Sequence, residues 1–291
     1  PYTTLSRSRS GLPTATNEYI SIDASLNGQT LDLAGATTYA GEKHIVGNGY
    51  EETTLTGGIN CTSKTTLSNL AANGVVVIAG TLTLGDVFIP NGATVALSGS
   101  GKFNFEKVTG NGGTLDFNQT AYSFSNNTLL DGLVITNAKQ PTTQGYGVLY
   151  YYDNSADIDR AITIKNCVFT GNGASYGLIW VRGGINAGHS GKRIVNLTGC
   201  TFSNNLNAGS AAVLVNSNGI ANITDCKFDD VNKLTIFSGG LISFSGSNTI
   251  GRILDGTTGI VTLSSGAILD LTGNTNATPI APGGGIVISS G

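Results

Sequence analysis

The chain has 291 residues and carries 15 basic and 18 acidic side chains, which gives a formal net charge of −3. This near-neutral balance argues against a nucleic-acid-binding protein, and the 40% hydrophobic content argues against an intrinsically disordered one. No apolar run reaches the roughly 18 residues that a membrane-spanning helix requires. Glycine supplies 42 positions and methionine none, while Thr, Ser, Asn, Val and Ile are abundant, so the composition predicts an all-β fold.

The N-terminal half consists of short alternating segments separated by turn residues. We expect residues 1–20 to form a lead-in or N-terminal cap and residues 21–291 to form a single domain, because no break in composition divides the rest of the chain. Glycine and asparagine separate six predicted strands. These strands are Val75–Ile78, Thr81–Leu84, Val87–Ile89, Thr94–Leu97, Lys102–Phe105 and Thr114–Phe117.

The second half contains an internal repeat. Each copy alternates apolar and polar residues, omits one alternation step and then resumes. The copies are Leu130–Ile135, Ile162–Phe169, Val195–Phe202 and Ala221–Phe228, and their last apolar residues lie 34, 33 and 26 positions apart. The omitted step falls on residue types that tolerate a left-handed backbone, namely Gly132, Asn166, Gly199 and Asp225. Two short strands joined by a bend and repeated about every 30 residues predict a parallel β-solenoid.

A second strand follows the first in each copy. Four segments align at spacings of 30, 34 and 29 residues, namely Gly147–Tyr151, Gly177–Val181, Ala211–Val215 and Gly240–Phe244. Variation in repeat length is concentrated in the polar connections 152–160 and 182–193, which we expect to leave the solenoid as loops.

Stacked coils should bring equivalent side chains of the repeat into columns. The inward columns are predicted to contain Cys167, Cys200 and Cys226 beside Phe169, Phe202 and Phe228. We interpret the cysteines as small buried hydrophobic residues. Their spacing contains no Cys-x-x-Cys pair and no His partner, which argues against a zinc site.

The outward positions of the second strand are unusually apolar. We define the outer strip as Val148, Tyr150, Tyr152, Leu178, Trp180 and Leu214, with Ala212 and Leu241 beside it. On stacked coils these side chains would form an exposed aromatic patch, and such patches mark interaction surfaces. Three interpretations stay open: a loop of the same chain (153–160 or 191–206) covers the strip, a protein or a second copy binds it, or sugars stack on it.

A Phe-x-x-Asn motif recurs beside a looser glycine motif. The copies are Phe124–Asn127, Phe169–Asn172 and Phe202–Asn205, with Gly177–Ile179, Ala211–Val213 and Gly239–Ile242 as the glycine partners. Over residues 25–250 this pattern resembles right-handed parallel β-helix surface proteins, especially the chlamydial polymorphic outer-membrane proteins and adhesin-like autotransporter passengers. The resemblance implies a single right-handed parallel β-helix that is secreted or exposed on the cell surface. Its partner would be a host or neighbouring-cell surface protein or glycan, or a second copy of the chain.

Candidate catalytic residues are also present, because many right-handed β-helices cleave polysaccharides with paired carboxylates or with a basic residue and calcium. They are Asp153, Asp157 and Asp159 with Arg160, His189 within the stretch 188–193, and Asp229 with Asp230. Solvated loops and a turn explain these groups more simply. We therefore expect a non-enzymatic adhesin-type or structural module that needs no cofactor and no metal ion. A polysaccharide lyase, hydrolase or tailspike-like depolymerase is one alternative, and a self-assembling fibre subunit is another.

Overall fold

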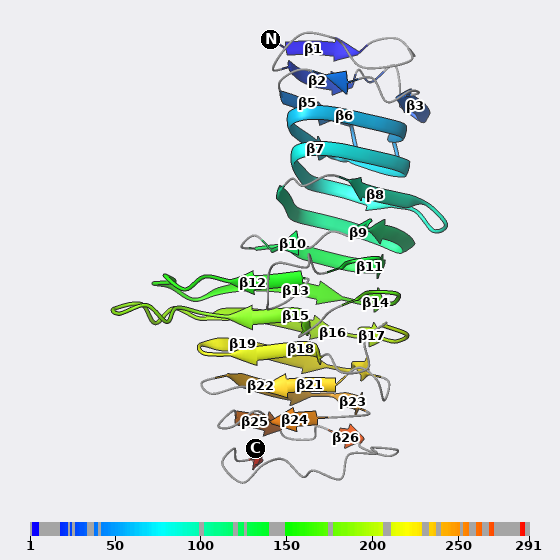
Figure 1. Ribbon diagram of the computed structural model, residues 1–291. Coiled ribbons are helices and arrows are strands. Elements are labelled where there is room, and N and C mark those ends of the chain that lie inside the picture. The colour runs from blue at the N-terminus through cyan, green and yellow to red at the C-terminus, as the bar shows by residue number, and fades with distance from the viewer. Residues whose placement is uncertain are drawn as a thin grey trace. The chain divides into compact units, whose positions relative to one another are not determined.

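The architecture is that of a computed structural model of the chain (Figure 1). The description covers residues 2–5, 18–22, 24, 27–33, 38–39, 42–98, 102–118, 122–124, 127–139, 149–173, 177–205, 211–228, 233–236, 240–250, 253–255, 260–263, 268–270 and 286–288. Across these residues the regular elements are β-strands and none is an α-helix, which confirms the predicted all-β class. In this described part, no helix is long and apolar enough to cross a membrane.

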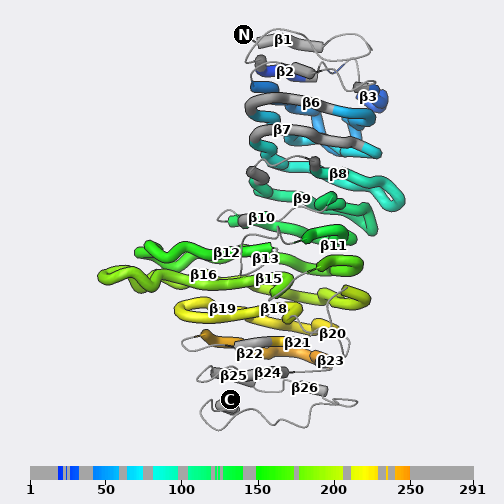
Figure 2. Tube along the Cα trace, in the orientation of Figure 1, coloured from blue at the N-terminus to red at the C-terminus, as the bar shows by residue number. Residues whose placement is uncertain are grey.

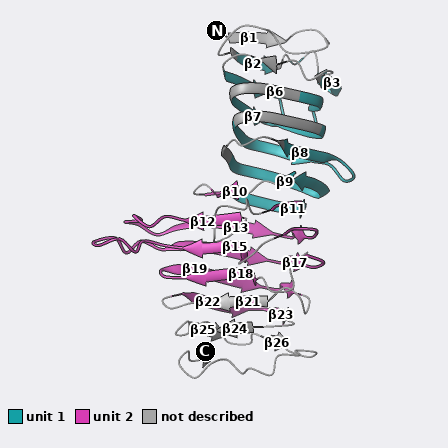
Figure 3. Ribbon diagram, viewed as in Figure 1, with its two compact units in different colours: residues 1–120, 129–136 teal, residues 121–128, 137–291 magenta. Residues whose placement is uncertain are grey.

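The chain divides into two compact units (Figure 3). Unit 1 contains residues 1–120 and 129–136, and unit 2 contains residues 121–128 and 137–291. The predicted division into a lead-in over residues 1–20 and one domain over residues 21–291 stays a prediction.

Unit 1 is built from parallel strands, several of them long. They are β1 (Tyr2–Leu5), β2 (Glu18–Ile22), β3 (Gln29–Leu33), β4 (Thr38–Tyr39), β5 (Glu42–Val46), β6 (Thr53–Ser68), β7 (Leu70–Ile89), β8 (Thr94–Ser98), β9 (Lys102–Asp116) and β11 (Leu129–Thr136). The main ladder runs β1, β2, β5, β6, β7, β9 and β11, while β3 and β4 pair with β6, and β8 pairs with β7 and β9. The three strands predicted between residues 75 and 89 are parts of one continuous strand, β7. This strand pairs with β6 both before and after Gly80, and with β9 both before and after Gly85.

Three ladders of parallel strands run through unit 2. The first contains β13 (Arg160–Lys165), β16 (Arg193–Thr198), β19 (Gly219–Thr224), β22 (Leu241–Ser245), β25 (Ile260–Leu263) and β27 (Ile286–Ile288). The second contains β14 (Val168–Phe169), β17 (Thr201–Phe202), β20 (Lys227–Phe228), β23 (Ser247–Ile250) and β26 (Ile268–Asp270). The third contains β10 (Tyr122–Ser123), β12 (Leu149–Tyr152), β15 (Gly177–Arg182), β18 (Ala211–Asn216), β21 (Lys233–Ile236) and β24 (Ile253–Asp255). From β12 to β20, each repeat of the chain supplies one strand to each ladder in the same order.

The predicted column of cysteines is confirmed. The Thr201 N–H donates to the Cys167 carbonyl oxygen at 2.9 Å, and the Lys227 N–H donates to the Cys200 carbonyl oxygen at 2.8 Å. Cys167, Cys200 and Cys226 are all buried, and none of the three forms a disulfide bond. A hydrogen bond with Cys226, and then burial, raise the pKa of the Cys200 thiol above its ordinary value of 9.0. Since the thiolate is the reactive form, the Cys200 thiol has a packing role. The same hydrogen bond lowers the pKa of the Cys226 thiol.

The predicted column of phenylalanines is confirmed as well. The rings of Phe169 and Phe202 are parallel, with centroids 4.5 Å apart, and the ring of Phe228 stacks on Phe202 at 4.6 Å. All three side chains are fully buried. Each ring is therefore covered by the equivalent ring of the neighbouring repeat and shielded from water.

The omitted alternation steps lie where the backbone turns left-handed. Their φ angles are +69° at Gly132, +54° at Asn166, +62° at Gly199 and +53° at Asp225. Glycine has no Cβ to clash in this region, and Asn and Asp tolerate it better than other residues. The sequence pattern therefore located these bends correctly.

The Phe-x-x-Asn motif has a structural role in unit 2. The Asn172 side chain is buried, and its Oδ1 accepts a hydrogen bond from the Ala138 N–H at 2.9 Å. Its amide nitrogen donates to Oδ1 of Asn205 at 3.0 Å, and the Asn205 amide donates to the Phe169 carbonyl oxygen at 3.1 Å. These asparagines satisfy backbone groups where the chain turns and connect one repeat to the next.

One predicted alignment is wrong. The segment Gly240–Phe244 was aligned with the third ladder, but β22 pairs with β19 in the first ladder, with Leu241 opposite Ile220. The third ladder continues instead from β18 to β21, where Leu214 lies opposite Thr235. Ile242 and Phe244 supply the inward apolar pair that strands of both ladders have, so the inward pattern alone did not separate the two ladders. Leu241 is therefore not a neighbour of Leu214 in that ladder.

Replacing Phe202 by Ala should destabilise unit 2 by about 3–5 kcal/mol. The ring is packed between Phe169 and Phe228, so its removal leaves a cavity between them. Urea unfolding followed by circular dichroism measures this loss. The matched control is Phe88→Ala in unit 1, where the ring is half-buried and tilted against Tyr50. Equal losses in the two variants would contradict the account of the phenylalanine column.

Candidate functional site

Two connections of unit 2 lie against each other, and we call residues 153–159 and 183–192 the paired loops. The first joins β12 to β13 and the second joins β15 to β16. The equivalent connection between β18 and β19 contains only residues 217–218. Figures 1 and 2 show that the two longer connections project beyond the strands that they join. The predicted loops between residues 152 and 160 and between residues 182 and 193 are therefore confirmed.

Backbone hydrogen bonds hold the paired loops together. The N–H groups of Ile185 and Asn186 both donate to the Asn154 carbonyl oxygen, at 2.9 and 3.0 Å. The Gly191 N–H donates to the Ala156 carbonyl oxygen at 2.7 Å. Regular pairing therefore continues from the ladders into the loops, which stiffens segments that would otherwise be mobile.

Two glycines allow this close approach. A Cβ atom on Gly184 would lie 2.5 Å from the Ala156 carbonyl oxygen, and one on Gly191 would lie 2.5 Å from the Ile158 nitrogen. Both obstacles are backbone atoms, which cannot rotate aside as a side chain can. Any larger residue at either position must therefore separate the loops.

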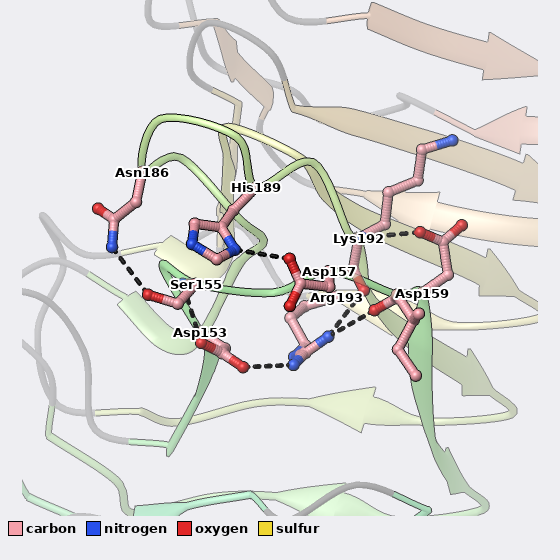
Figure 4. A network of polar contacts seen from close by, with 9 residues as sticks. Asp153, Ser155, Asp157, Asp159, Asn186, His189, Lys192 and Arg193 are labelled. Atoms are coloured by element: carbon pink, nitrogen blue, oxygen red, sulfur yellow. Dashed lines mark hydrogen bonds and ion pairs between the residues drawn. The ribbon is translucent and has the colours of Figure 1, made fainter.

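A buried arginine joins the loops to the strands (Figure 4). The Arg193 side chain is only 6% exposed, and its Nη2 lies 2.6 Å from Oδ2 of Asp153. Its Nη1 donates to the carbonyl oxygens of Ile158 and Lys192, at 3.1 and 3.2 Å. Its guanidinium carbon lies 5.7 Å from the ring centroid of Tyr151. This fully engaged cation has a structural role, since a buried charge is tolerated only when it is paired.

The other candidate acids also connect the two loops (Figure 4). Oδ1 of Asp157 lies 2.6 Å from Nδ1 of His189, and Oδ1 of Asp159 accepts a hydrogen bond from the Lys192 N–H at 2.8 Å. These partners are 32 and 33 residues apart, which is one repeat. The sequence prediction treated the acids and the stretch 188–193 as separate candidates. An offset of one repeat length between the two segments, about 33 residues, would have predicted that the acids lie beside the stretch 188–193.

The loops present apolar side chains to solvent. Ile158 is 56% exposed and Ile185 is 41% exposed, and Tyr152 at the base of the loops is 43% exposed. Their polar side chains, in contrast, largely hold one loop to the other. The arrangement therefore offers a stiff surface that carries exposed apolar groups, which suits binding.

Three of the six outer-strip residues, Leu178, Trp180 and Leu214, are buried. An exposed patch is wrong for these three, and cover by the chain itself is the interpretation that fits them. Their exposed fractions are 2%, 6% and 5%. Trp180, Ala211 and Leu214 form one hydrophobic cluster, against which Tyr150 packs. The chain itself supplies this burial, as strands that are apolar on both faces require.

The remaining members of the outer strip differ from one another. Tyr150 is half-buried, Tyr152 is exposed, and Val148 lies outside the described residues. The ring of Tyr152 stacks on Trp180 with centroids 5.1 Å apart. Whether any of these side chains touches a partner stays a prediction.

The sequence prediction missed two polar residues beside these aromatic rings. Arg182 lies opposite Tyr152 in the third ladder, and Asn216 lies opposite Arg182. The Arg182 guanidinium carbon lies 6.0 Å from the Trp180 ring centroid. Both residues end a strand of the ladder, and their place in the repeat is the signal that could have identified them.

No clustering of three or more His, Cys, Asp or Glu side chains suitable for a metal ion occurs in the described ranges. Asp229 and Asp230 lie outside those ranges. No protein-family model, curated protein or solved structure matches this chain. The geometry of the site therefore supplies the argument for function.

Stability should depend on pH through Tyr151. Burial raises the pKa of Tyr151 from its ordinary value of 10.0 to about 12, and Arg193 opposes this shift. Below pH 10 the phenol is protonated in both the folded and unfolded chain, so its contribution to stability is fully present. Between pH 10 and 12 only the unfolded chain releases the proton, and we expect a loss of about 2–3 kcal/mol. Urea unfolding at pH 8, 10 and 11.5 should show a shallower decline for Tyr151→Phe, and parallel declines would contradict this.

Gly191→Ala should separate the paired loops and destabilise the chain by about 1–3 kcal/mol, because the new methyl group meets backbone atoms. Hydrogen exchange at the amides of residues 185, 186 and 191 should accelerate. The control is Gly173→Ala in the same unit, where the nearest atom to an added Cβ is the Lys139 Cγ at 3.8 Å. Unchanged exchange in Gly191→Ala would show that the loops are not held as described.

Proposed function

We propose that this chain is a single right-handed parallel β-helix that binds a partner through its paired loops, as adhesin-type surface modules do. The regular order of strands in the three ladders of unit 2 supports the β-helix, since one strand per ladder and per repeat is how such a coil is built. The stacked cysteines and phenylalanines support it further.

The observation that carries the binding role is the combination of stiffness and apolar exposure in the paired loops. Backbone pairing and the Asp153–Arg193 pair fix the loops, while Ile158 and Ile185 remain exposed. A preorganised surface loses little conformational entropy on binding, so exposed apolar contacts contribute more of their free energy to affinity. A loop that served only to connect two strands would need neither feature.

The proposed setting is extracellular or on a cell surface, with no role for nucleic acid. The partner would be a surface protein or glycan of a host or neighbouring cell, or a second copy of the chain in a fibre. The resemblance of the repeats to β-helix surface proteins supports this setting. Loops on a rigid coil can vary without disturbing the fold, which suits a recognition surface.

One observation favours polysaccharide cleavage as a second candidate. His189 and Asp157 form a hydrogen-bonded pair whose side chains are 32% and 72% exposed, and a His–carboxylate pair can transfer protons in catalysis. Release of new reducing ends from a polysaccharide panel tests this candidate. Cleavage that disappears in His189→Ala would replace the binding proposal with an enzymatic one.

The double variant Ile158→Ser/Ile185→Ser should reduce binding to a recognised cell type or glycan at least about tenfold, because two apolar contacts are lost. Flow cytometry with the labelled chain and a glycan array measure this loss. The control is Val46→Ser in unit 1, at a position that is 40% exposed. Binding that survives the double variant unchanged would rule out the paired loops as the contact surface.

A further inference from the structure

Three side chains form a row at the base of the paired loops. Tyr152, Arg182 and Asn216 lie opposite one another on β12, β15 and β18, and we call them the terminal row. Tyr152 precedes the first of the paired loops directly, and Arg182 precedes the second. The terminal row thus adjoins the surface that we propose for partner binding.

Arg182 is a cation with no acidic partner among the described residues. Its guanidinium group lies over Trp180, and its Nε is buried with no hydrogen-bond acceptor in the part of the chain that the structure describes. Oδ1 of Asn216 is likewise buried and has no donor within the described structure. A buried polar atom left without a partner needs an explanation, and a ligand that supplies the missing partner is one.

The local charge favours an anion. Residues 150–193 carry five basic and three acidic side chains, whereas the whole chain has a net charge of −3. The three acids, Asp153, Asp157 and Asp159, bind Arg193, His189 and the Lys192 N–H. Arg182 therefore remains available to an outside carboxylate.

We propose that the terminal row binds an acidic saccharide, a proposal that rests on the binding function above and names its ligand class. The exposed Tyr152 ring, supported from behind by Trp180, offers a flat face on which a sugar ring can stack. The Arg182 guanidinium donates to the sugar carboxylate, for which its planar fork is well matched. On binding, the half-buried Asn216 side chain rotates so that its Oδ1 accepts a hydrogen bond from a sugar hydroxyl group. An acidic peptide would use Arg182 but would supply no flat ring of hydroxyl donors for the other two residues.

Calorimetric titration of the full chain with matched probes tests this assignment. The acidic probes are trigalacturonate and 3′-sialyllactose, and the neutral probes are methyl-esterified trigalacturonate and lactose. We expect at least one acidic probe to bind tenfold or more tightly than its neutral counterpart, with an affinity that falls as salt rises. Arg182→Gln should remove this preference, and Arg182→Lys should restore only part of it because lysine lacks the fork.

Arg160→Gln is the matched control, since it removes one exposed positive charge nearby and leaves the terminal row intact. It should change the affinity less than threefold. Tyr152→Ala should lower the affinity for both the acidic and the neutral probe of each pair, because both stack a sugar ring on the tyrosine. Urea unfolding of each variant shows whether a loss of binding comes from misfolding. If Arg182→Gln is misfolded, the affinities of Arg182→Lys and Tyr152→Ala decide whether the terminal row binds the saccharide.

The saccharide assignment would be overturned by equal affinity for acidic and neutral probes, by an Arg182→Gln variant that binds like the original chain, or by a Glu-rich peptide that binds Arg182 more tightly than any sugar. No binding of any probe would overturn it too. In that case, if the double variant Ile158→Ser/Ile185→Ser still loses binding to the partner, the proposed function of the paired loops remains supported. If that variant also kept its binding, both proposals would fail.

Discussion

The register of the parallel ladders is the constraint on which the rest of unit 2 depends. Parallel pairing sets each residue over its equivalent in the next repeat, so Phe202 meets Phe169 and Phe228, and the cysteines meet one another. A shift by one residue would turn every inward side chain outward. The left-handed residues at the bends fix where each strand ends, which keeps the register from slipping.

The paired loops inherit this register. Because they leave the ladders at equivalent positions in successive repeats, their side chains meet partners one repeat away, as His189 meets Asp157. Glycine at 184 and 191 then lets their backbones pair, and the buried Arg193 ties them to the strands. The terminal row arises in the same way, since Tyr152, Arg182 and Asn216 are equivalent residues of three strands. The repeat thus produces a surface with stacked rings and a cation, Arg182, that no acidic side chain of the described ranges pairs.

The sequence alone predicted what depends on local pattern. Alternation and the Cys-x-Phe spacing gave the repeat, its inward columns and its left-handed bends, and the loop boundaries at residues 152, 160, 182 and 193 were correct. It failed where an answer depends on which strand pairs with which, as for Gly240–Phe244, whose inward apolar residues fit two ladders. It left open whether the chain itself covers Trp180, because that depends on contacts with residues that are distant in sequence, such as Leu214. The contacts of Arg193 and His189 follow only when the register is known.

The positions of the sulfur atoms test the stacking of repeats most directly. Anomalous diffraction at long wavelength from crystals of the chain locates sulfur without reference to any assumed structure. If the ladders are in the register described, the sulfurs of Cys167, Cys200 and Cys226 will lie in one line at intervals of about 5 Å, the spacing of neighbouring strands. If the sulfur of Cys200 lies more than about 10 Å from that of Cys167 or of Cys226, or off a common line with them, the register is contradicted, and with it the paired loops and the terminal row.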